Sequence, residues 1–172
     1  MTKATIATTA GDIVVEIADL DAPKAASNFV KLAKEGFYDG VIFHRVIPGF
    51  VIQGGDGEYG RVDARGEVRS RGRVGQGGPG YRFEDEPFTG DYERGVLAMA
   101  NAGKNTNGSQ FFICHADLRG KLPKNYTIFG QVTNGFDVAK KIAEVPVEPA
   151  AAGEASTPTV DVHIVTVTIE EK

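Results

Sequence analysis

A single permanently charged side chain, Arg45, interrupts the apolar stretch of residues 41–52. If the first half of this stretch is a β-strand, its side chains alternate between two faces, and Arg45 shares a face with Phe43 and Ile47. A guanidinium does not lose its proton, so it needs a hydrogen-bond acceptor from the protein or from a ligand. The strand alone leaves two interpretations open: a half-exposed surface arginine, or a donor in a binding site.

Amide side chains recur beside apolar ones in later segments. Gln53 lies on the second strand of the same stretch, and Asn101 and Gln110 flank a polar run that contains an Asn-Gly turn pair. The apolar members of this candidate face are Phe50, Phe112 and Leu122. An apolar pocket ringed by amide and guanidinium donors has the composition needed to hold an extended peptide. The alternative is that the phenylalanines are core residues and the amides line turns.

Other kinds of chemistry lack their residues. The three histidines are too scattered to predict a metal site, so we expect no metal and no cofactor; they are His44, His115 and His163. Cys114 follows an apolar strand and is typical of a small core residue, whereas a redox role would require an exposed thiol of low pKa. The acidic run 84–86 is typical of solvated charges in a turn, and no Gly-x-Ser-x-Gly motif occurs.

Composition predicts one globular domain over residues 1–172. The chain has 172 residues, 41% of them hydrophobic, with a net charge of −4; this is enough for a core and argues against a nucleic-acid partner. The first residues show no apolar signal-peptide region, and no run approaches the roughly 20 apolar residues of a membrane helix. With its lone cysteine, the chain is expected to be a cytoplasmic monomer that binds no membrane.

Periodicity and turn residues predict a mainly β fold. Strands are expected at 5–9, 13–17, 41–47, 50–56, 95–101, 110–114, 125–132 and 161–169. Helices are expected at 23–35, with a proline at its start, and at 135–144, with Asn134 as N-cap. The arginine- and glycine-rich residues 57–80 and the proline-rich residues 146–158 are expected to be exposed loops. The absence of a βαβ rhythm favours eight antiparallel strands closed into a barrel, capped by two helices.

Three segments resemble the signatures of one family. They are residues 43–56 (FHRVIPGFVIQGGD), 97–103 (LAMANAG) and 105–113 (NTNGSQFFI). They look like the motifs of the cyclophilins, which are peptidyl-prolyl cis–trans isomerases, and the similarity extends over about residues 6–169. The resemblance implies an eight-stranded antiparallel closed β-barrel capped by two α-helices. It also implies an enzyme that accelerates rotation about X–Pro bonds in protein substrates and assists protein folding.

The resemblance also assigns roles to residues. Arg45 is implied to be the catalytic arginine, which donates to the prolyl nitrogen of the twisted transition state. The implied substrate-binding residues are Phe50, Val51, Gln53, Ala100, Asn101, Gln110, Phe112, Leu122 and Tyr126. The implied partners are proline-containing peptides and unfolded or folding proteins. An alternative from another class is a peptide-binding or chaperone module in which catalysis is secondary.

Three departures from the family pattern stand out. Lys121 stands where many members have a tryptophan that helps to bind cyclosporin, so binding of that inhibitor is expected to be weakened. Tyr126 stands where many members have histidine and is still able to wall a pocket. Residues 57–74 form an arginine-rich insertion. We hypothesise that it favours substrates with acidic flanking residues; the alternative is a neutral surface loop.

Overall fold

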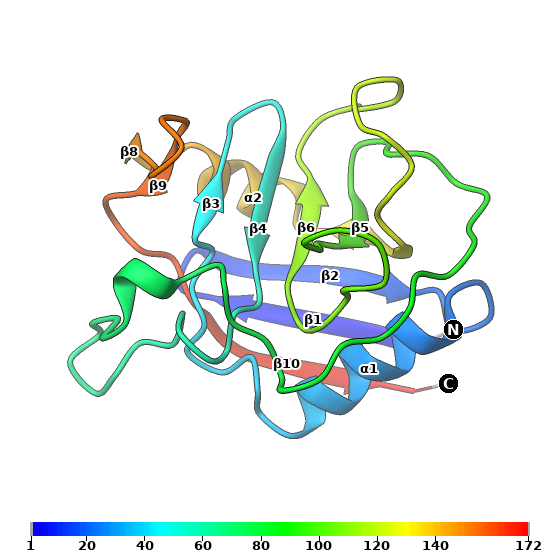
Figure 1. Cartoon of the computed structure of the whole chain (residues 1–172). Helices are drawn as coiled ribbons and strands as arrows, with labels where there is room; N and C mark the ends of the chain where they lie inside the picture. Colours follow the sequence, from blue (N-terminus) through cyan, green and yellow to red (C-terminus); the bar gives the residue numbers. More distant parts are fainter. Residues whose placement is uncertain (1, 172) are drawn as a thin grey trace.

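A curled antiparallel sheet of eight strands dominates the computed structural model, which describes residues 2–171 (Figure 1). Its first hairpin follows from the β-branched runs near the N-terminus, which alternate between buried and more exposed positions and pair from Thr2↔Ile17 to Thr8↔Gly11. The bounds of the eight strands are β1 (Thr2–Thr8), β2 (Gly11–Ile17), β3 (Arg45–Val46), β4 (Val51–Gly54), β5 (Val96–Met99), β6 (Phe111–Cys114), β7 (Ile128–Asn134) and β10 (Ile164–Glu170).

The strand order is β10-β1-β2-β7-β5-β6-β4-β3, so the sheet has β10 at one end and β3 at the other. The curl brings these ends close together, as an isolated bridge joins Ile42 to His163 and the amide of Phe43 donates to Val162 O at 3.0 Å. The mainly β prediction with eight antiparallel strands is confirmed. The sheet is a half-barrel, however, and an isolated bridge rather than a continuous ladder spans its seam.

The first helix, α1 (Pro23–Lys34), begins at Pro23 as the sequence predicts, because the missing amide of proline costs no helical hydrogen bond there. The backbone N–H groups at its amino end are bound by a side chain that is far away in the sequence. Both oxygens of the buried Glu86 carboxylate accept backbone N–H groups, from Ala25 at 2.7 Å and from Lys24 at 3.0 Å. The prediction that the acidic run 84–86 is merely solvated is therefore wrong for Glu86, which caps α1.

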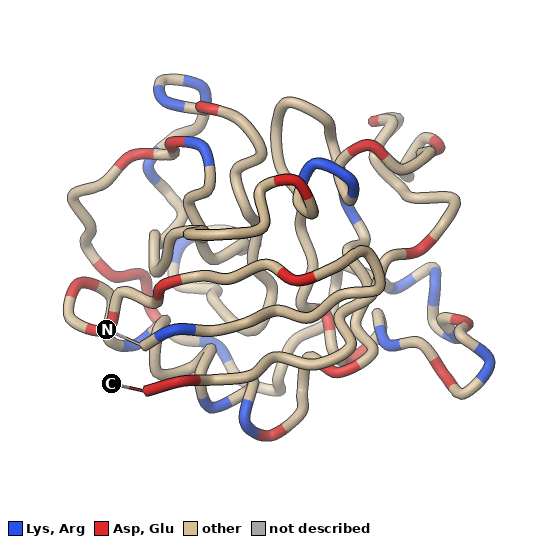
Figure 2. The backbone as a smooth tube through the Cα atoms, turned by 180° about the vertical axis from the view of Figure 1, so that it is seen from behind, with Lys and Arg blue, Asp and Glu red and all other residues tan. Residues whose placement is uncertain are grey.

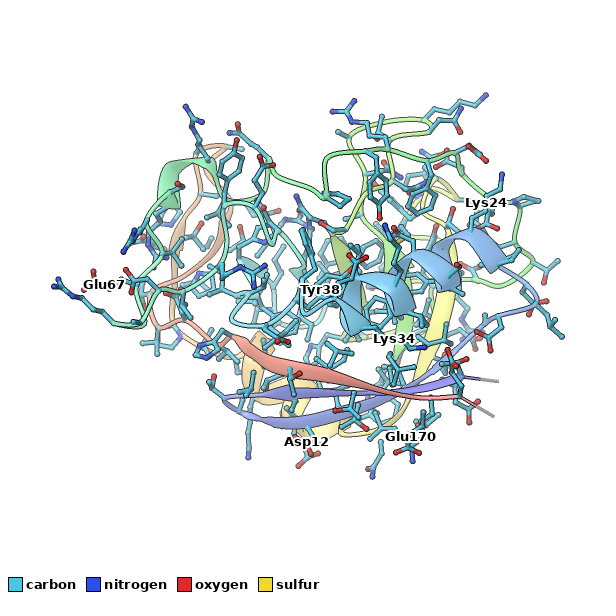
Figure 3. All side chains as sticks on the ribbon, turned by 90° about the horizontal axis from the view of Figure 1, so that it is seen from below. Asp12, Lys24, Lys34, Tyr38, Glu67 and Glu170 are labelled. Carbon is cyan, nitrogen blue, oxygen red and sulfur yellow. The ribbon has the colours of Figure 1, made fainter. Side chains whose placement is uncertain are left out.

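The apolar face of α1 centres on Phe29, which is fully buried. Its ring lies 5.2 to 5.6 Å, centroid to centroid, from three other aromatic rings: Tyr38, Phe111 and Phe129. Because these rings come from β6, from β7 and from the segment after α1, Phe29 joins the helix to the concave side of the sheet. Seen from below, α1 and strands β1, β2 and β10 form the two sides of this core (Figure 3).

The second helix, α2 (Phe136–Ala143), packs against β2 and β4. Its predicted N-cap was wrong by one residue, since Gly135 occupies that position and Asn134 only accepts a hydrogen bond from the Gly135 amide. Gly135 has φ +94°, and a Cβ there would lie 2.4 Å from Asp12 O. Only glycine fits this close approach, so backbone contact with β2 overrides side-chain capping.

Residues 146–158 are not the plain exposed loop that the sequence predicts. They form a second, two-stranded sheet of β8 (Val147–Pro149) and β9 (Ala155–Pro158), and β9 lies against β3 (Figure 1). Proline at the ends of such short strands is compatible with pairing, because it removes few ladder hydrogen bonds. The segment lacks the alternating apolar residues that would predict strands, and its contact with β3 joins residues far apart in the sequence.

The arginine-rich segment is tied to the rest of the chain by its own side chains. Arg61 donates to the carbonyl of Phe37 at 2.6 Å and also to that of Asp39, and Arg71 pairs with Asp161 at 2.7 Å. The segment includes a short 3-10 turn, η1 (Arg71–Arg73), and a bridge between Val62 and Val68. Basic and acidic residues are interspersed along it and over the molecule as a whole (Figure 2).

We expect Phe29→Ala to lower the free energy of unfolding by about 3–5 kcal/mol, because it leaves a cavity between three rings of the core. Denaturant titration measures this change. Leu20→Ala is the matched control, since Leu20 is 95% exposed, and it should change stability by less than about 0.5 kcal/mol. Equal effects of the two substitutions would contradict the assignment of Phe29 to the centre of the core.

Candidate active site

The hairpin of β3 and β4 positions Arg45. In its ladder Arg45 pairs directly with Gln53, which places both side chains on one face. The connecting turn is held by a hydrogen bond of 2.9 Å from the Ile47 amide to Val51 O and by His115 Nδ1, which accepts from the Gly49 amide at 2.8 Å. The turn therefore fixes the register that brings the arginine and the amide together.

The guanidinium of Arg45 has acceptors on two sides. Its Nη1 donates to Gln53 Oε1 at 3.4 Å, while its Nε and Nη2 donate to the two oxygens of Glu154 at 2.9 and 3.2 Å. It also lies 5.8 Å from the centroid of the Phe50 ring. The side chain nevertheless stays 34% exposed. Arg45 is thus held in place and still open to solvent on the surface of the protein.

An apolar wall stands next to this arginine on the outer face of the sheet. Strand alternation sends Phe111 into the main core and its neighbour Phe112 to the opposite face, where Phe112 packs edge-on against Tyr126 with 5.4 Å between centroids. A small apolar cluster forms around Phe112. Of the predicted site residues, this cluster brings together Phe50, Val51, Ala100, Phe112, Leu122 and Tyr126.

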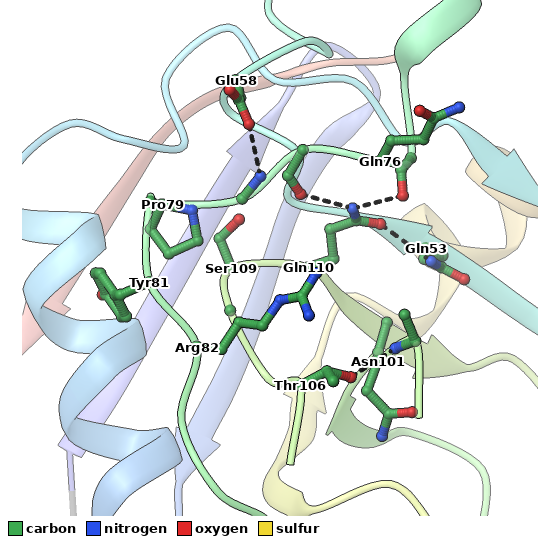
Figure 4. A pocket seen from close by; sticks show the side chains of 17 residues that line it. Gln53, Glu58, Gln76, Pro79, Tyr81, Arg82, Asn101, Thr106, Ser109 and Gln110 are labelled. Carbon is green, nitrogen blue, oxygen red and sulfur yellow. Dashed lines mark hydrogen bonds between the residues drawn. The ribbon is translucent and has the colours of Figure 1, made fainter. Parts of the chain in front are cut away.

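Amide side chains form a continuous polar rim beside the wall. Gln53 Nε2 donates to Gln110 Oε1 at 3.3 Å, and Gln110 Nε2 donates to the carbonyls of Gly75 and Gly77, each at 2.9 Å (Figure 4). The side chain of Asn101 donates to Asn125 O at 2.8 Å and accepts from the Gly103 amide of its own loop at 3.2 Å. The predicted amide residues therefore lie close together, although the side chain of Asn101 is already hydrogen-bonded within the protein.

A cleft of about 750 Å³ opens along this rim. It is bordered by four predicted site residues, namely Gln53, Ala100, Asn101 and Gln110. The other border is the glycine-rich segment 75–80 together with Tyr81 and Arg82, whose side chains are seen in Figure 4. Arg45 and Phe112 lie outside this cleft, so the amide residues stand between the polar cleft and the apolar wall around Phe112. Such an arrangement suits a chain that crosses from one to the other.

A buried carboxylate shapes the rim. Asp56 is 0% exposed, and its oxygens accept backbone N–H groups from Tyr59 at 2.9 Å, Gly75 at 2.8 Å and Gly77 at 3.0 Å, as well as from Glu58 at 3.1 Å. One side chain therefore ties both ends of the arginine-rich segment to the end of β4. A Cβ on Gly77 would lie 2.1 Å from Asp56 Oδ1, so this approach requires glycine.

The histidine next to the catalytic candidate is neutral. The pKa of His44 is lowered to about 4, mainly by burial; the charge of Asp56 opposes this shift and the charge of Arg45 adds to it. The imidazole therefore adds no positive charge beside Arg45 at neutral pH. This leaves the guanidinium as the cation that faces the wall.

Two members of the site were not predicted from the sequence. Glu154 lies 109 residues after Arg45, in a segment that the sequence presents as a loop, and nothing in its neighbours signals a contact with β3. Asp56 is the last residue of the motif 43–56, and the motif assigns it no role. Its position between a strand and a glycine-rich segment is the local signal that points to it. Glu154 was missed because its partner is 109 residues away, and Asp56 because two of its four partners, Gly75 and Gly77, lie 19 and 21 residues further along the chain.

Within residues 2–171, no group of three or more histidine, cysteine, aspartate or glutamate side chains is arranged to hold a metal ion. In the same part of the chain, neither helix combines the length and the apolar character that crossing a membrane requires. The fold and the site thus define a β half-barrel with a surface groove, formed where a fixed cation, an apolar wall and the amide-lined cleft lie side by side.

Comparison with known proteins identifies the family of the chain. Residues 3–169 match the family model described as cyclophilin type peptidyl-prolyl cis-trans isomerase/CLD. A peptidyl-prolyl cis-trans isomerase of Helicobacter pylori is 46% identical over 145 residues, which cover 82% of this chain and 80% of that protein. The isomerase ppi1 of Schizosaccharomyces pombe is 44% identical over 158 residues, covering 87% and 94%.

Solved structures agree with these relatives. A crystal structure of a cyclophilin type isomerase of Cryptosporidium parvum superposes with a TM-score of 0.81 at 34% identity, covering 99% of this chain and 98% of that one. A second crystal structure of the same protein was determined in the presence of the dipeptide Ala-Pro. The chain belongs to the cyclophilin-type peptidyl-prolyl cis–trans isomerases, and it is an isomerase enzyme of that family.

We expect Cys114 to resist alkylation in the folded protein. Its side chain is 1% exposed, and burial raises the pKa of the thiol to about 12, so little thiolate exists at about pH 8. Mass spectrometry after treatment with iodoacetamide should find the native protein unmodified and the denatured protein fully labelled. Rapid labelling of the native protein would restore a redox or nucleophilic role for this residue.

We expect Asp56→Asn to lower the free energy of unfolding by at least about 3 kcal/mol, because an amide turns donors toward backbone donors that the carboxylate satisfies. Asp63→Asn is the matched control. Asp63 accepts backbone N–H groups from Arg65 and Glu67 in an exposed loop, and its substitution should cost less than about 1 kcal/mol. Thermal and denaturant unfolding of both variants measure the difference, and similar losses would contradict a special role for Asp56.

Proposed function

We propose that Arg45 is the catalytic residue of this isomerase and that its substrates are X–Pro bonds in proline-containing peptides and in unfolded or folding proteins. The observation that carries this proposal is the placement of Arg45. Its guanidinium is held by acceptors on two sides and lies beside the apolar wall, 5.8 Å from the centroid of the Phe50 ring, while the side chain remains 34% exposed. No other cation among the described residues combines these three properties.

The reaction needs only stabilisation of a rotational transition state. Rotation about an X–Pro bond makes and breaks no covalent bond, but it faces a barrier of roughly 18–20 kcal/mol, because the planar amide is stabilised by conjugation. In the twisted transition state that conjugation is lost, and the prolyl nitrogen regains a lone pair. A donor aimed at this nitrogen therefore binds the transition state in preference to the planar substrate, as catalysis requires.

Arg45 has the properties of such a donor. By analogy with the donors of oxyanion holes, one charge-assisted hydrogen bond of this kind supplies about 2.7–4 kcal/mol, or roughly 10²–10³ in rate. The planar guanidinium presents several N–H groups in a fixed fork, so one group reaches the nitrogen while another holds a carbonyl. Lysine offers the charge without the fork and would be a poor replacement.

The surrounding residues contact different parts of the substrate. We assign the proline ring to the apolar wall, whose residues are Phe50, Val51, Phe112, Leu122 and Tyr126. An apolar wall also helps the twisted amide, which is less polar than the planar one and loses less on leaving water. We assign the peptide backbone to Gln53, Ala100, Asn101 and Gln110. Because the Asn101 amide already bonds to Asn125, its contact with the peptide falls to its main chain.

Two expectations from the sequence extend this proposal. Lys121 is exposed beside Leu122, so the pocket margin lacks an aromatic ring at that position, and cyclosporin should bind weakly. For residues 57–74 the sequence left two alternatives open, a selector of acidic substrates and a neutral surface loop, and we favour the neutral loop. This assignment is supported by the acceptors that Arg61, Arg69 and Arg71 find within the protein itself.

We expect Arg45→Ala to keep the fold and to lower kcat/KM at least about a hundredfold, because the donor to the prolyl nitrogen is lost. A protease-coupled or NMR exchange assay on an Ala-Pro peptide measures the change. Arg65→Ala, in the exposed loop, is the matched control and should retain normal activity. Near-normal turnover by a folded Arg45→Ala protein would refute the assignment.

The same variant separates enzyme from chaperone. If the Arg45→Ala protein still suppresses aggregation of an unfolded protein as well as the natural chain does, peptide holding is independent of catalysis. If both activities fall together, folding assistance depends on the catalytic step.

A further inference from the structure

Glu154 is the principal neighbour of Arg45 that neither the sequence motifs nor the strand register accounts for. It lies in the turn between β8 and β9, just before Ala155 begins the second strand. The turn is built from short hydrogen bonds, with the Ala150 amide donating to Glu154 O at 2.7 Å and the Gly153 amide donating to Ala150 O at 2.8 Å. Because β9 lies against β3, the hairpin carries this carboxylate to the arginine.

The hydrogen bonds of Arg45 to Glu154 and Gln53 leave two N–H groups of the guanidinium unused. A guanidinium has five N–H groups, one on Nε and two on each terminal nitrogen. Glu154 accepts from Nε and Nη2, and Gln53 accepts from Nη1. Two N–H groups are then left, one on each terminal nitrogen. A two-point contact on the Nε side also fixes the plane of the guanidinium, which a single acceptor would leave free to rotate.

The state of the carboxylate fits this role. The hydrogen bond from Arg45 lowers the pKa of Glu154 below its ordinary value, burial opposes this shift, and Ser156 supports it by a further hydrogen bond. Glu154 is therefore ionised at neutral pH, and the two-point contact is intact under working conditions.

The pair contributes little to the stability of the fold. Both side chains are substantially solvated, with exposures of 34% for Arg45 and 43% for Glu154, and ion pairs at such positions add little to folding. The geometry is therefore more useful for placing a side chain than for holding the protein together. An arginine side chain has several rotatable bonds, and a donor that samples many conformations stabilises a transition state much less than one held in a single conformation.

We propose that Glu154 is a positioning residue for the isomerase reaction, which orients the Arg45 guanidinium so that its two remaining terminal N–H groups face the prolyl bond. This inference rests on the proposed role of Arg45. It makes the β8–β9 hairpin part of the catalytic apparatus. The alternative is that Glu154 inhibits the reaction, since a carboxylate bound to the arginine competes with a substrate carbonyl. The experiment distinguishes positioning from inhibition.

The test compares Glu154→Ala and Glu154→Gln with the natural chain by NMR exchange on an Ala-Pro peptide. We expect Glu154→Ala to lower kcat about threefold to tenfold with little change in KM, because the loss falls on the transition state and not on peptide binding. Glu154→Gln keeps one acceptor for the arginine and should recover part of the loss. Glu148→Ala, which removes an exposed carboxylate of the same hairpin, should be silent.

A double-mutant cycle with Arg45→Ala keeps this proposal separate from the role of Arg45. If Glu154 acts through Arg45, Glu154→Ala has no further effect once Arg45 is alanine. An unchanged or increased kcat in the single Glu154→Ala variant, with Arg45→Ala strongly impaired, would overturn the positioning role while leaving the role of Arg45 intact. Near-normal activity of Arg45→Ala itself would instead refute the proposed function.

The fold of each variant is checked by thermal unfolding. A melting temperature of Glu154→Ala close to that of the natural chain, together with a lower kcat, supports positioning. A large fall in melting temperature that Glu154→Gln does not reverse would show that the hairpin contact is structural, and this would also overturn the proposal.

Discussion

The cation of Arg45, held at the edge of an apolar surface, is the constraint on which the geometry of the groove depends. A guanidinium cannot become neutral, so the protein has to supply acceptors wherever it places one. One acceptor, Gln53, comes from the neighbouring strand through the ladder register, and the other, Glu154, comes from a hairpin outside the main sheet. The arrangement leaves the arginine ordered without burying it.

The two faces of the same strands serve two purposes. Within β6, Phe111 packs into the main core while Phe112 builds the outer wall, and within β4, Ile52 and Val51 divide in the same way. This follows from the two-residue period of a strand. The rigidity of the groove thus comes directly from the packing of the core behind it, because no loop intervenes between them.

Buried carboxylates organise the parts of the molecule that the sheet does not reach. Glu86 caps α1 from a segment 61 or more residues away, and Asp56 accepts four backbone N–H groups, two at each end of the arginine-rich segment. In each case a charged acceptor satisfies several donors that would otherwise be unpaired. Such contacts set the position of the glycine-rich border of the cleft, and this border in turn receives Gln110.

The sequence by itself determined the class of fold, the family, and the residues that gather in the groove. Strand periodicity, the proline at the start of α1 and the long motifs around Arg45 are local signals, and each is complete within a few consecutive residues. The hairpin of β8 and β9, the capping by Glu86, the N-cap at Gly135 and the pairing of Arg45 with Glu154 were decided only by the tertiary structure. Glu86 and α1, Glu154 and Arg45, Gly135 and Asp12, and β9 and β3 are each far apart in the chain, and none of these partners has a signature near it in the sequence. The catalytic candidate was therefore visible from the sequence, whereas the residue that orients it was not.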